Sequence, residues 1–187
     1  MLYLNDDIAH FDFEAALPLL SEQRRKQALK FKHELGRKTC AAAYLLLCEA
    51  LRKEYGITEK PVFEYSEHGK PMLVGFPKIH FNFSHCREAV VCIVSDHPVG
   101  VDVESIREYK ESLVNYTMNE DEAQQIIHSE NPALTFTKFW TRKEALLKLT
   151  GEGIGGRSMK EVLTGTEEIE TVVCKEKNYV YSVVFGK

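Results

Sequence analysis

The chain has 187 residues, 44% of them hydrophobic and 28% charged, which is the composition of a globular protein with one domain or two small fused lobes. No apolar run approaches the roughly 20 residues that span a bilayer, and the N-terminal segment is acidic where a signal peptide is basic. We therefore expect a cytoplasmic protein with no membrane partner. The net charge of −4 gives no reason to expect nucleic-acid binding. The five cysteines form no C-x-x-C pair, which predicts buried free thiols.

Two helices are predicted in the first part of the chain. Ser21 is the expected cap of a helix that begins at Glu22, and a second, largely apolar helix over residues 37–55 is expected to end at Gly56. The segment "RRKQALKFKHELGRK", residues 24–38, holds seven Lys or Arg residues. Such a cluster indicates either a solvated helix face or a site for phosphate or for an acidic protein surface.

The pattern then becomes extended. Short apolar or alternating segments predict strands, and Gly- and Pro-containing turns separate them. The predicted strands are "PVFEYS" (61–66), "IHFNFSH" (79–85), "AVVCIVS" (89–95) and "VGVDVES" (99–105).

Helical periodicity returns after residue 105, and the chain ends in strands. Helices are predicted in residues 119–129, where Asn119 and Glu122 have capping-box spacing, and in residues 133–149. Two final strands are expected to meet at a tight turn near Lys177-Asn178. The sequence thus predicts an α+β fold with two pseudo-symmetric lobes, residues 1–97 and 98–187, each a small, mainly antiparallel sheet packed on helices.

Two carboxylates in "GVDVES" are spaced for one face of a strand. Asp102 and Glu104 are two residues apart, whereas Val101 and Val103 point to the opposite face, toward a core. Neighbouring carboxylates repel each other unless a cation lies between them, and oxygen ligands of this kind suit Mg²⁺. The motif indicates either a magnesium site or an edge strand whose acids lie in water.

Two shorter motifs are compatible with anion binding. Ser84 and His85 end the strand in "HFNFSH" and offer donors to a phosphate, although a histidine satisfied within a turn is the alternative. In "EHGKP", the Gly69-Lys70-Pro71 turn holds a lysine still and allows backbone to approach a ligand, or it is an ordinary turn.

The helix of residues 133–149 carries Trp140, Glu144 and Lys148 at intervals of four, so they are expected to share one face. The stripe expected on the opposite side, toward the core, is Phe136, Phe139, Leu146 and Leu149. The sequence "GEGIGG" that follows, residues 151–156, matches G-x-G-x-x-G. Because it follows a helix rather than a strand, it is interpreted as a helix C-cap and flexible loop, not as a nucleotide-binding motif.

The ordered set "HGKP", "HFNFSH", "GVDVE" and "FWTRKEALLKLTGEG" resembles the 4′-phosphopantetheinyl transferases, in particular the larger, two-lobed surfactin-synthetase type. The resemblance covers residues 21–155. It implies an active site in the cleft between two lobes of one compact unit, and transfer of the phosphopantetheine arm of coenzyme A to a serine of an apo acyl or peptidyl carrier protein. It also implies Mg²⁺ as cofactor and 3′,5′-ADP as product. We expect a monomer, since the two lobes already form an internal interface.

The resemblance also implies roles for individual residues. Asp102, Glu104 and Glu144 match the acids that hold Mg²⁺. Lys148 matches the lysine that contacts phosphate and can protonate the leaving group, and the Ser84-His85 pair matches residues near the phosphates.

The remaining matches concern the adenosine 3′-phosphate and one further acid. The turn of Gly69, Lys70 and Pro71 is implied to lie beside this phosphate. Two further matches near it change residue type but keep the charge, with Arg24 in place of a lysine and Lys38 in place of an arginine. Gln27 stands where a second basic residue can occur, and Glu122, or Glu120 in a shifted alignment, matches a glutamate near the metal in some members.

Several alternatives stay open from the sequence. The base that accepts the carrier serine proton is either Glu144 or a water on the metal, and the carrier can belong to fatty-acid, polyketide or peptide synthesis. The rival functions are a magnesium-dependent coenzyme A pyrophosphate hydrolase, in which water replaces the serine, and a non-catalytic module that binds coenzyme A or a carrier protein.

Overall fold

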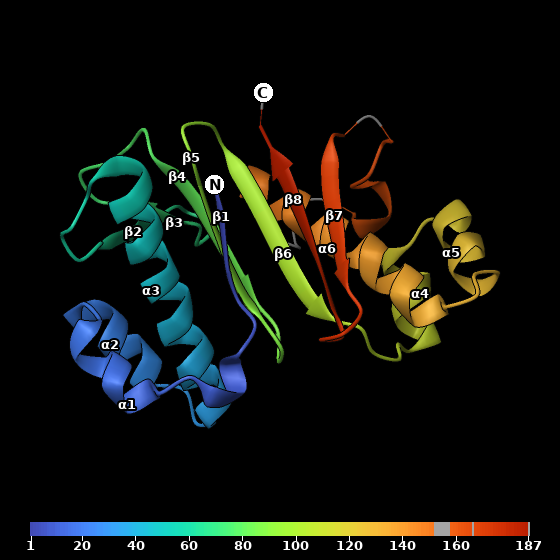
Figure 1. The fold of residues 1–187 in the computed structure, drawn as a ribbon. Helices are drawn as coiled ribbons and strands as arrows, with labels where there is room; N and C mark the ends of the chain where they lie inside the picture. Colours follow the sequence, from blue (N-terminus) through green and yellow to red (C-terminus); the bar gives the residue numbers. More distant parts are fainter. Residues whose placement is uncertain (152–157, 166, 187) are drawn as a thin grey trace.

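The computed structural model describes residues 1–151, 158–165 and 167–186 (Figure 1). The first half contains β1 (Leu2–Asn5), α1 (Phe13–Ala16), α2 (Glu22–Leu29), α3 (Glu34–Tyr55), β2 (Phe63–Tyr65), β3 (Pro71–Leu73), β4 (His80–His85) and β5 (Val90–Ser95). The second half contains β6 (Val99–Ser105), α4 (Glu111–Thr117), α5 (Glu120–Ile127), α6 (Pro132–Thr150), β7 (Ile169–Cys174) and β8 (Tyr179–Phe185). The fold is α+β, as the sequence predicts.

Two small antiparallel sheets are packed on helices. The first has the strand order β1-β5-β4 and the second has the order β6-β8-β7, while β2 and β3 form a separate hairpin. Helix α3 packs on the first sheet and α6 on the second, and β6 lies alongside β4 and β5 where the two sheets meet (Figure 1).

The predicted helix caps are confirmed, although α3 begins at Glu34, three residues before the predicted start at residue 37. The Ser21 hydroxyl accepts a hydrogen bond from the Arg24 amide, and Asn119 and Glu122 form the reciprocal capping box at the start of α5. Gly56 ends α3 and Gly151 ends α6, both with left-handed backbone, at φ 68° and 77°. The remainder of the glycine-rich segment, residues 152–157, lies outside the described residues.

Four elements were not predicted from the sequence: β1, α1, β3 and α4. Each has between three and seven residues, which is too short for a hydrophobic period to be recognised. Strand β1 pairs with β5, and Leu2 lies opposite Ile93. Because these two residues are far apart in the sequence, no local pattern indicates the pairing.

Two expectations about burial are wrong. Trp140 does not lie opposite Phe136 but stacks on it, with ring centroids 5.9 Å apart, because positions four apart on a helix share a side. The five thiols are free, but only Cys40 and Cys92 are buried. Cys174 is half-buried because β7 is an edge strand, and Cys48 and Cys86 are also half-buried.

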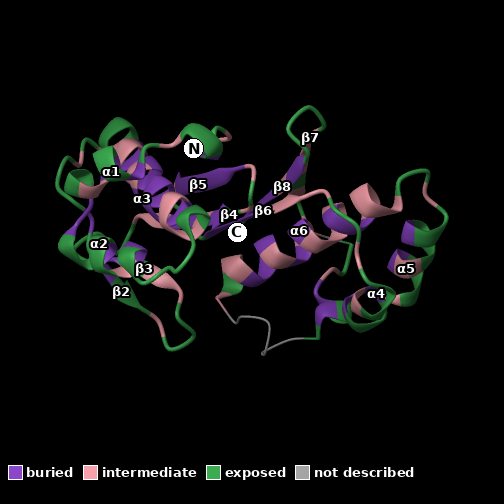
Figure 2. Ribbon diagram, turned by 90° about the horizontal axis from the view of Figure 1, so that it is seen from below, coloured by how far each residue is buried: buried purple, intermediate pink, exposed green. Residues whose placement is uncertain are grey.

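Strand β6 and helix α6 approach each other so closely that Gly100 has no space for a side chain. A Cβ at this position would lie 2.0 Å from the Ala145 carbonyl oxygen and 2.7 Å from the Leu149 amide nitrogen, both backbone atoms. The approach brings the side chains of α6 directly over the face of β6 that carries Asp102. Figure 2 shows mainly buried positions on β5 and β6, and a mixture of buried and partly buried positions on α6.

Candidate active site

Three elements bring Ser84, Asp102 and Lys148 into contact. The Lys148 ammonium donates to Ser84 Oγ at 2.8 Å and to Asp102 Oδ1 at 2.6 Å, and Ser84 Oγ donates to the same carboxylate oxygen at 2.8 Å. Ser84 comes from β4, Asp102 from β6 and Lys148 from α6. Ser84 and Asp102 are buried, so the ion pair is largely shielded from solvent.

The carboxylates around this contact carry more negative charge than the neighbouring lysine neutralises. Asp102 Oδ2 and Glu144 Oε1 are buried without a hydrogen-bond partner. Desolvation and then the charge of Asp102 raise the pKa of Glu104 and of Glu144 above its ordinary value. A hydrogen bond from the Trp140 side chain opposes this effect at Glu104.

The acidic group offers oxygen ligands to a metal ion without forming a complete metal centre. Across residues 1–151, 158–165 and 167–186, no three His, Cys, Asp or Glu side chains converge closely enough to form a ready metal centre. The two unpartnered carboxylate oxygens nevertheless belong to two of the three predicted ligands. Hard oxygen donors in this number suit Mg²⁺, which needs only one or two carboxylates and completes its coordination with water and phosphate oxygens. The residues therefore fit the ion.

A pocket of about 220 Å³ opens beside the acidic group. Its lining combines the predicted turn with residues of β4 and α6, namely His68, Gly69, Lys70, Pro71, Asn82, Phe83, Glu144, Leu147, Lys148 and Gly151. Small-molecule pockets commonly enclose about 300–1,000 Å³. This one is therefore sized for part of a large ligand, with two lysines and a carboxylate at its wall.

The turn beside the pocket is held together by hydrogen bonds to Ser66. The Gly69 amide donates to Ser66 O at 2.9 Å, the Lys70 amide donates to Ser66 Oγ at 3.0 Å, and Gly69 has a φ of 80° that favours glycine. The Lys70 ammonium points across to α6 and donates to Leu149 O at 2.8 Å.

His85 and Arg24 lie at the edge of the same group of charges. His85 is exposed at the end of β4, yet the protein lowers the pKa of its imidazole, first by desolvation and then by repulsion from Lys148 and Arg24. Arg24 is buried: its guanidinium donates twice to Cys40 O, at 3.1 and 2.8 Å, and lies over the ring of Phe83. Arg24 is therefore not part of a solvated helix face.

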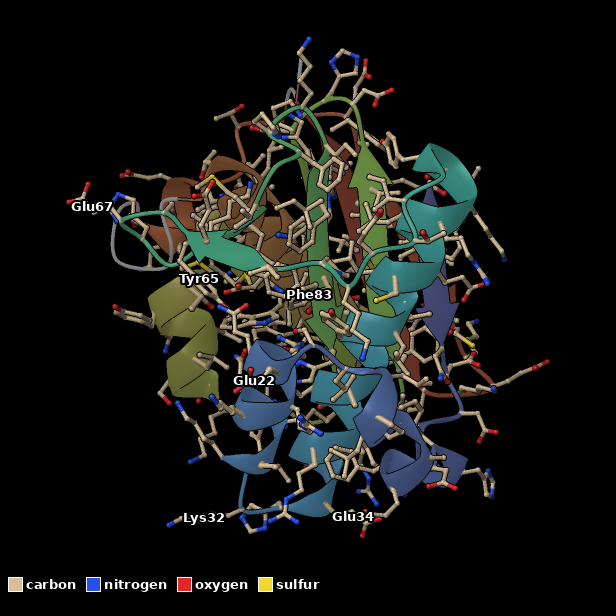
Figure 3. All side chains as sticks on the ribbon, turned by 90° about the vertical axis from the view of Figure 1, so that its left-hand side faces the viewer. Glu22, Lys32, Glu34, Tyr65, Glu67 and Phe83 are labelled. Carbon is tan, nitrogen blue, oxygen red and sulfur yellow. The ribbon has the colours of Figure 1, made fainter. Side chains whose placement is uncertain are left out.

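The structure does not bring Lys38 to the pocket. Its ammonium bonds to Ala9 O at 3.0 Å and pairs with Glu34. Figure 3 places Glu34 at the outer end of α2 and α3, well away from Phe83 at the pocket wall. Gln27 is held by Arg24, whose Nη1 donates to its side chain at 3.3 Å.

The sequence gives no indication of two features, one at the site and one on the other side of α6. In the sequence Asn82 is only one position of an alternating strand, but in the structure its buried side chain accepts from the Val101 amide at 3.3 Å and so joins β4 to β6. Glu122 was matched to a metal-site acid, but its carboxylate binds the fully buried Lys143 at 2.6 Å. Lys143 also donates to Thr117 O and Met159 O. A lysine inside an amphipathic helix gives no signal that it is buried.

The pocket has lysines at its wall and, beside it, carboxylates whose charge the lysines do not fully neutralise. This arrangement is typical of enzymes that transfer phosphoryl-type groups. Comparison with known proteins agrees. The sequence model described as "4'-phosphopantetheinyl transferase superfamily" matches residues 98–181. The 4′-phosphopantetheinyl transferase HetI of a Nostoc species is 31% identical over 158 residues, which cover 79% of this chain and 67% of HetI. The chain therefore belongs to the 4′-phosphopantetheinyl transferase superfamily.

Other relatives in the same family come from Bacillus. The chain is 31% identical to the 4′-phosphopantetheinyl transferase psf-1 of Bacillus pumilus over 154 residues, covering 81% of this chain and 66% of psf-1. It is 22% identical to the transferase Sfp of Bacillus subtilis over 156 residues, covering 82% of this chain and 70% of Sfp. The chain thus matches about two thirds of the length of these relatives. Among its described helices, none has the length and apolarity to cross a membrane.

Proposed function

We propose that this chain transfers the 4′-phosphopantetheine arm of coenzyme A to a serine of an apo acyl or peptidyl carrier protein, with Mg²⁺ as cofactor and 3′,5′-ADP as the second product. Family membership supports the reaction. The observation that carries the assignment to this site is the pair of buried, unpartnered oxygens, Asp102 Oδ2 and Glu144 Oε1, next to the Lys148 ammonium.

Asp102, Glu104 and Glu144 would hold the ion, which when bound supplies positive charge against the coenzyme A pyrophosphate. The raised pKa values of Glu104 and Glu144, caused first by desolvation and then by the charge of Asp102, support this role, because a bound cation offsets both effects on the charged carboxylates.

Lys148 stabilises the negative charge of the leaving group. Its ammonium lies at the pocket wall and can turn from Asp102 and Ser84 toward a phosphate. There it offsets the negative charge that develops on the departing 3′,5′-ADP and donates a proton to it. Ser84 Oγ and the imidazole of His85 are the neighbouring donors for phosphate oxygens.

Glu144 is a suitable acceptor for the proton of the attacking carrier serine. Its carboxylate lines the pocket, and its Oε1 is buried without a hydrogen-bond partner that would compete for the proton. The balance of the step is that the serine oxygen forms a bond to the β-phosphorus, the bond from that phosphorus to the oxygen bridging to 3′,5′-ADP breaks, and one proton leaves the serine.

Binding of the adenosine end is assigned to the backbone of the turn of Gly69, Lys70 and Pro71, together with Arg24. The position of the turn at the pocket wall supports this part of the proposal. Lys38 joins this set only if it leaves Ala9 O and Glu34 on binding. We also propose that residues 1–97 and 98–187 form two lobes with the site between them. The membership of β4 and β6 in different sheets supports this division.

The deciding experiment incubates the protein with coenzyme A, Mg²⁺ and an apo carrier protein, and measures the carrier mass. The expected result is addition of one phosphopantetheine group, dependent on the carrier serine and abolished by chelation of the metal. A parallel incubation without carrier separates the rival hydrolase. Equal cleavage of coenzyme A in its absence would contradict the transferase assignment, and binding without any turnover would indicate a non-catalytic module.

A further inference from the structure

The side chain of Lys70 lines the pocket and reaches from the β2–β3 turn to the end of α6. Its ammonium donates to Leu149 O at 2.8 Å across 79 residues of sequence. Leu149 is the next-to-last residue of α6, where backbone carbonyls have no partner within the helix. A cation at a helix C-terminus is also favoured by the helix dipole. The contact therefore satisfies an otherwise orphaned acceptor.

Contacts at its backbone and along its aliphatic stem fix the position of the Lys70 side chain. On one side the turn fixes the Lys70 backbone through Ser66, which accepts the Lys70 amide and donates its own amide to Lys70 O. On the other side the Lys70 stem lies over Gly151, where an added Cβ would be 3.2 Å from Lys70 Cδ. Gly151 thus leaves room for the lysine as well as ending α6. Glu67, at the tip of the same turn, points away into solvent (Figure 3).

We propose that Lys70 is a positioning residue that latches the 66–71 turn onto the C-terminal end of α6, and that it acts on coenzyme A by fixing the width of the pocket rather than by contacting the adenosine 3′-phosphate. The inference rests on the proposed function and revises the role that the sequence resemblance gives this lysine. Burial lowers the pKa of Lys70, as expected for an ammonium held between protein surfaces instead of in water.

The first test compares coenzyme A with 3′-dephospho-coenzyme A as substrates. Lys70→Met is expected to raise KM by the same factor for both, about tenfold, because a hydrogen bond from a charged donor is lost whichever substrate is bound. kcat should change little. Lys70→Arg should restore most of the affinity, since a guanidinium can also cap the helix. A rise in KM confined to coenzyme A would show a direct phosphate contact and overturn the proposal.

The second test needs no substrate. Hydrogen exchange of the free protein should become faster in Lys70→Met at the Gly69 and Lys70 amides and at the Gly151 amide, which bonds to Leu147 O. Unchanged exchange at both ends would overturn the latch. Lys78→Met is the matched control: it removes the same charge from the exposed β3–β4 connection, and should leave both KM values and the exchange pattern as in the wild type.

The two tests separate failure of the latch from failure of the proposed function. If wild-type protein transfers nothing to carriers, the function fails, yet the exchange experiment still decides whether Lys70 joins the turn to α6. If transfer is normal and exchange is unaffected by Lys70→Met, only the latch fails.

Discussion

Asp102 is the residue on which the site depends most. Its Oδ1 receives hydrogen bonds from Ser84 and Lys148, while its Oδ2 is buried without a partner. One carboxylate thus orients the two donors and offers a free oxygen toward the position proposed for the metal. The two hydrogen bonds to Oδ1 offset part of the free-energy cost of burying the Asp102 carboxylate.

Asp102→Ala is expected to abolish transfer while leaving the fold intact. The Lys148 ammonium keeps Ser84 as an acceptor, so the change removes the ion-holding oxygen without stranding the lysine. The measurements are transfer rate and circular dichroism, with Asp121→Ala, an exposed acid on α5, as control. Full activity in the Asp102 variant would refute the assignment of the metal ligands.

At the scale of elements, the position of α6 on β6 determines the geometry of the site. Gly100 allows the two backbones to meet, and Glu144 and Lys148 then lie over Asp102. The buried Lys143 holds the other side of α6 to α4, α5 and the segment at Met159.

Gly100→Ala should destabilise the protein by about 3 kcal/mol, because the added methyl group meets backbone that cannot rotate away. Urea unfolding measures the effect. Gly36→Ala in α3 is the control, since the atoms nearest to its Cβ would belong to the side chain of Phe31, which is exposed and can move. Equal stability of the two variants would contradict the close approach of β6 and α6.

Lys143→Met should cost about 3–5 kcal/mol of unfolding free energy, because Glu122 would remain buried without its partner. Adding Glu122→Gln should recover part of the loss, since the amide is neutral and can still accept from the Asn119 amide. Thermal and urea unfolding of the single and double variants check this. A double variant less stable than the single one would show that the buried charge is not the cause.

At the scale of the whole molecule, the N-terminal segment is tied to the C-terminal hairpin. Asp6 pairs with Lys177 at 2.7 Å and accepts from the Tyr179 hydroxyl at 3.0 Å, across more than 170 residues. The Met1 ammonium donates to Val94 O at 2.6 Å. The Asp6 contacts connect the end of β1, the outer strand of the first sheet, with the second sheet, whereas the Met1 contact lies within the first sheet.

Because of the Asp6 contacts, the free energy of unfolding should decrease as the pH falls into the acid range. The hydrogen bond from Lys177, followed by that from Tyr179, lowers the pKa of Asp6, although desolvation opposes the shift. A carboxyl with a lowered pKa stabilises the folded state above its ordinary value of about 4, and this contribution is lost as the pH falls through the lowered pKa.

Asp6→Asn should therefore be less stable than the wild type at neutral pH but lose less stability on acidification below pH ~4. Urea unfolding over a series of pH values checks the difference. Parallel pH profiles for the two proteins would show that Asp6 does not contribute through its charge.

The sequence by itself determined the long elements, their caps and the family. Helices α3 and α6 have many apolar positions and end at glycines, and the carboxylate pair and Lys148 occur in ordered motifs. Local periodicity and motif spacing are properties of neighbouring residues, so they can be read without knowledge of the fold. The short elements β1 and α4 carry too few residues for such a signal.

Only the tertiary structure decided what each charged side chain contacts. Lys148 and Asp102 are 46 residues apart, Lys70 and Leu149 are 79 apart, and Lys143 reaches Glu122 from the side of α6 away from the pocket. The sequence does not show which partner a basic side chain has. In the structure, Arg24, Lys70, Lys143 and Lys148 each have a different partner. The partner depends on which backbones the packing of the two sheets brings together, and no local pattern encodes that.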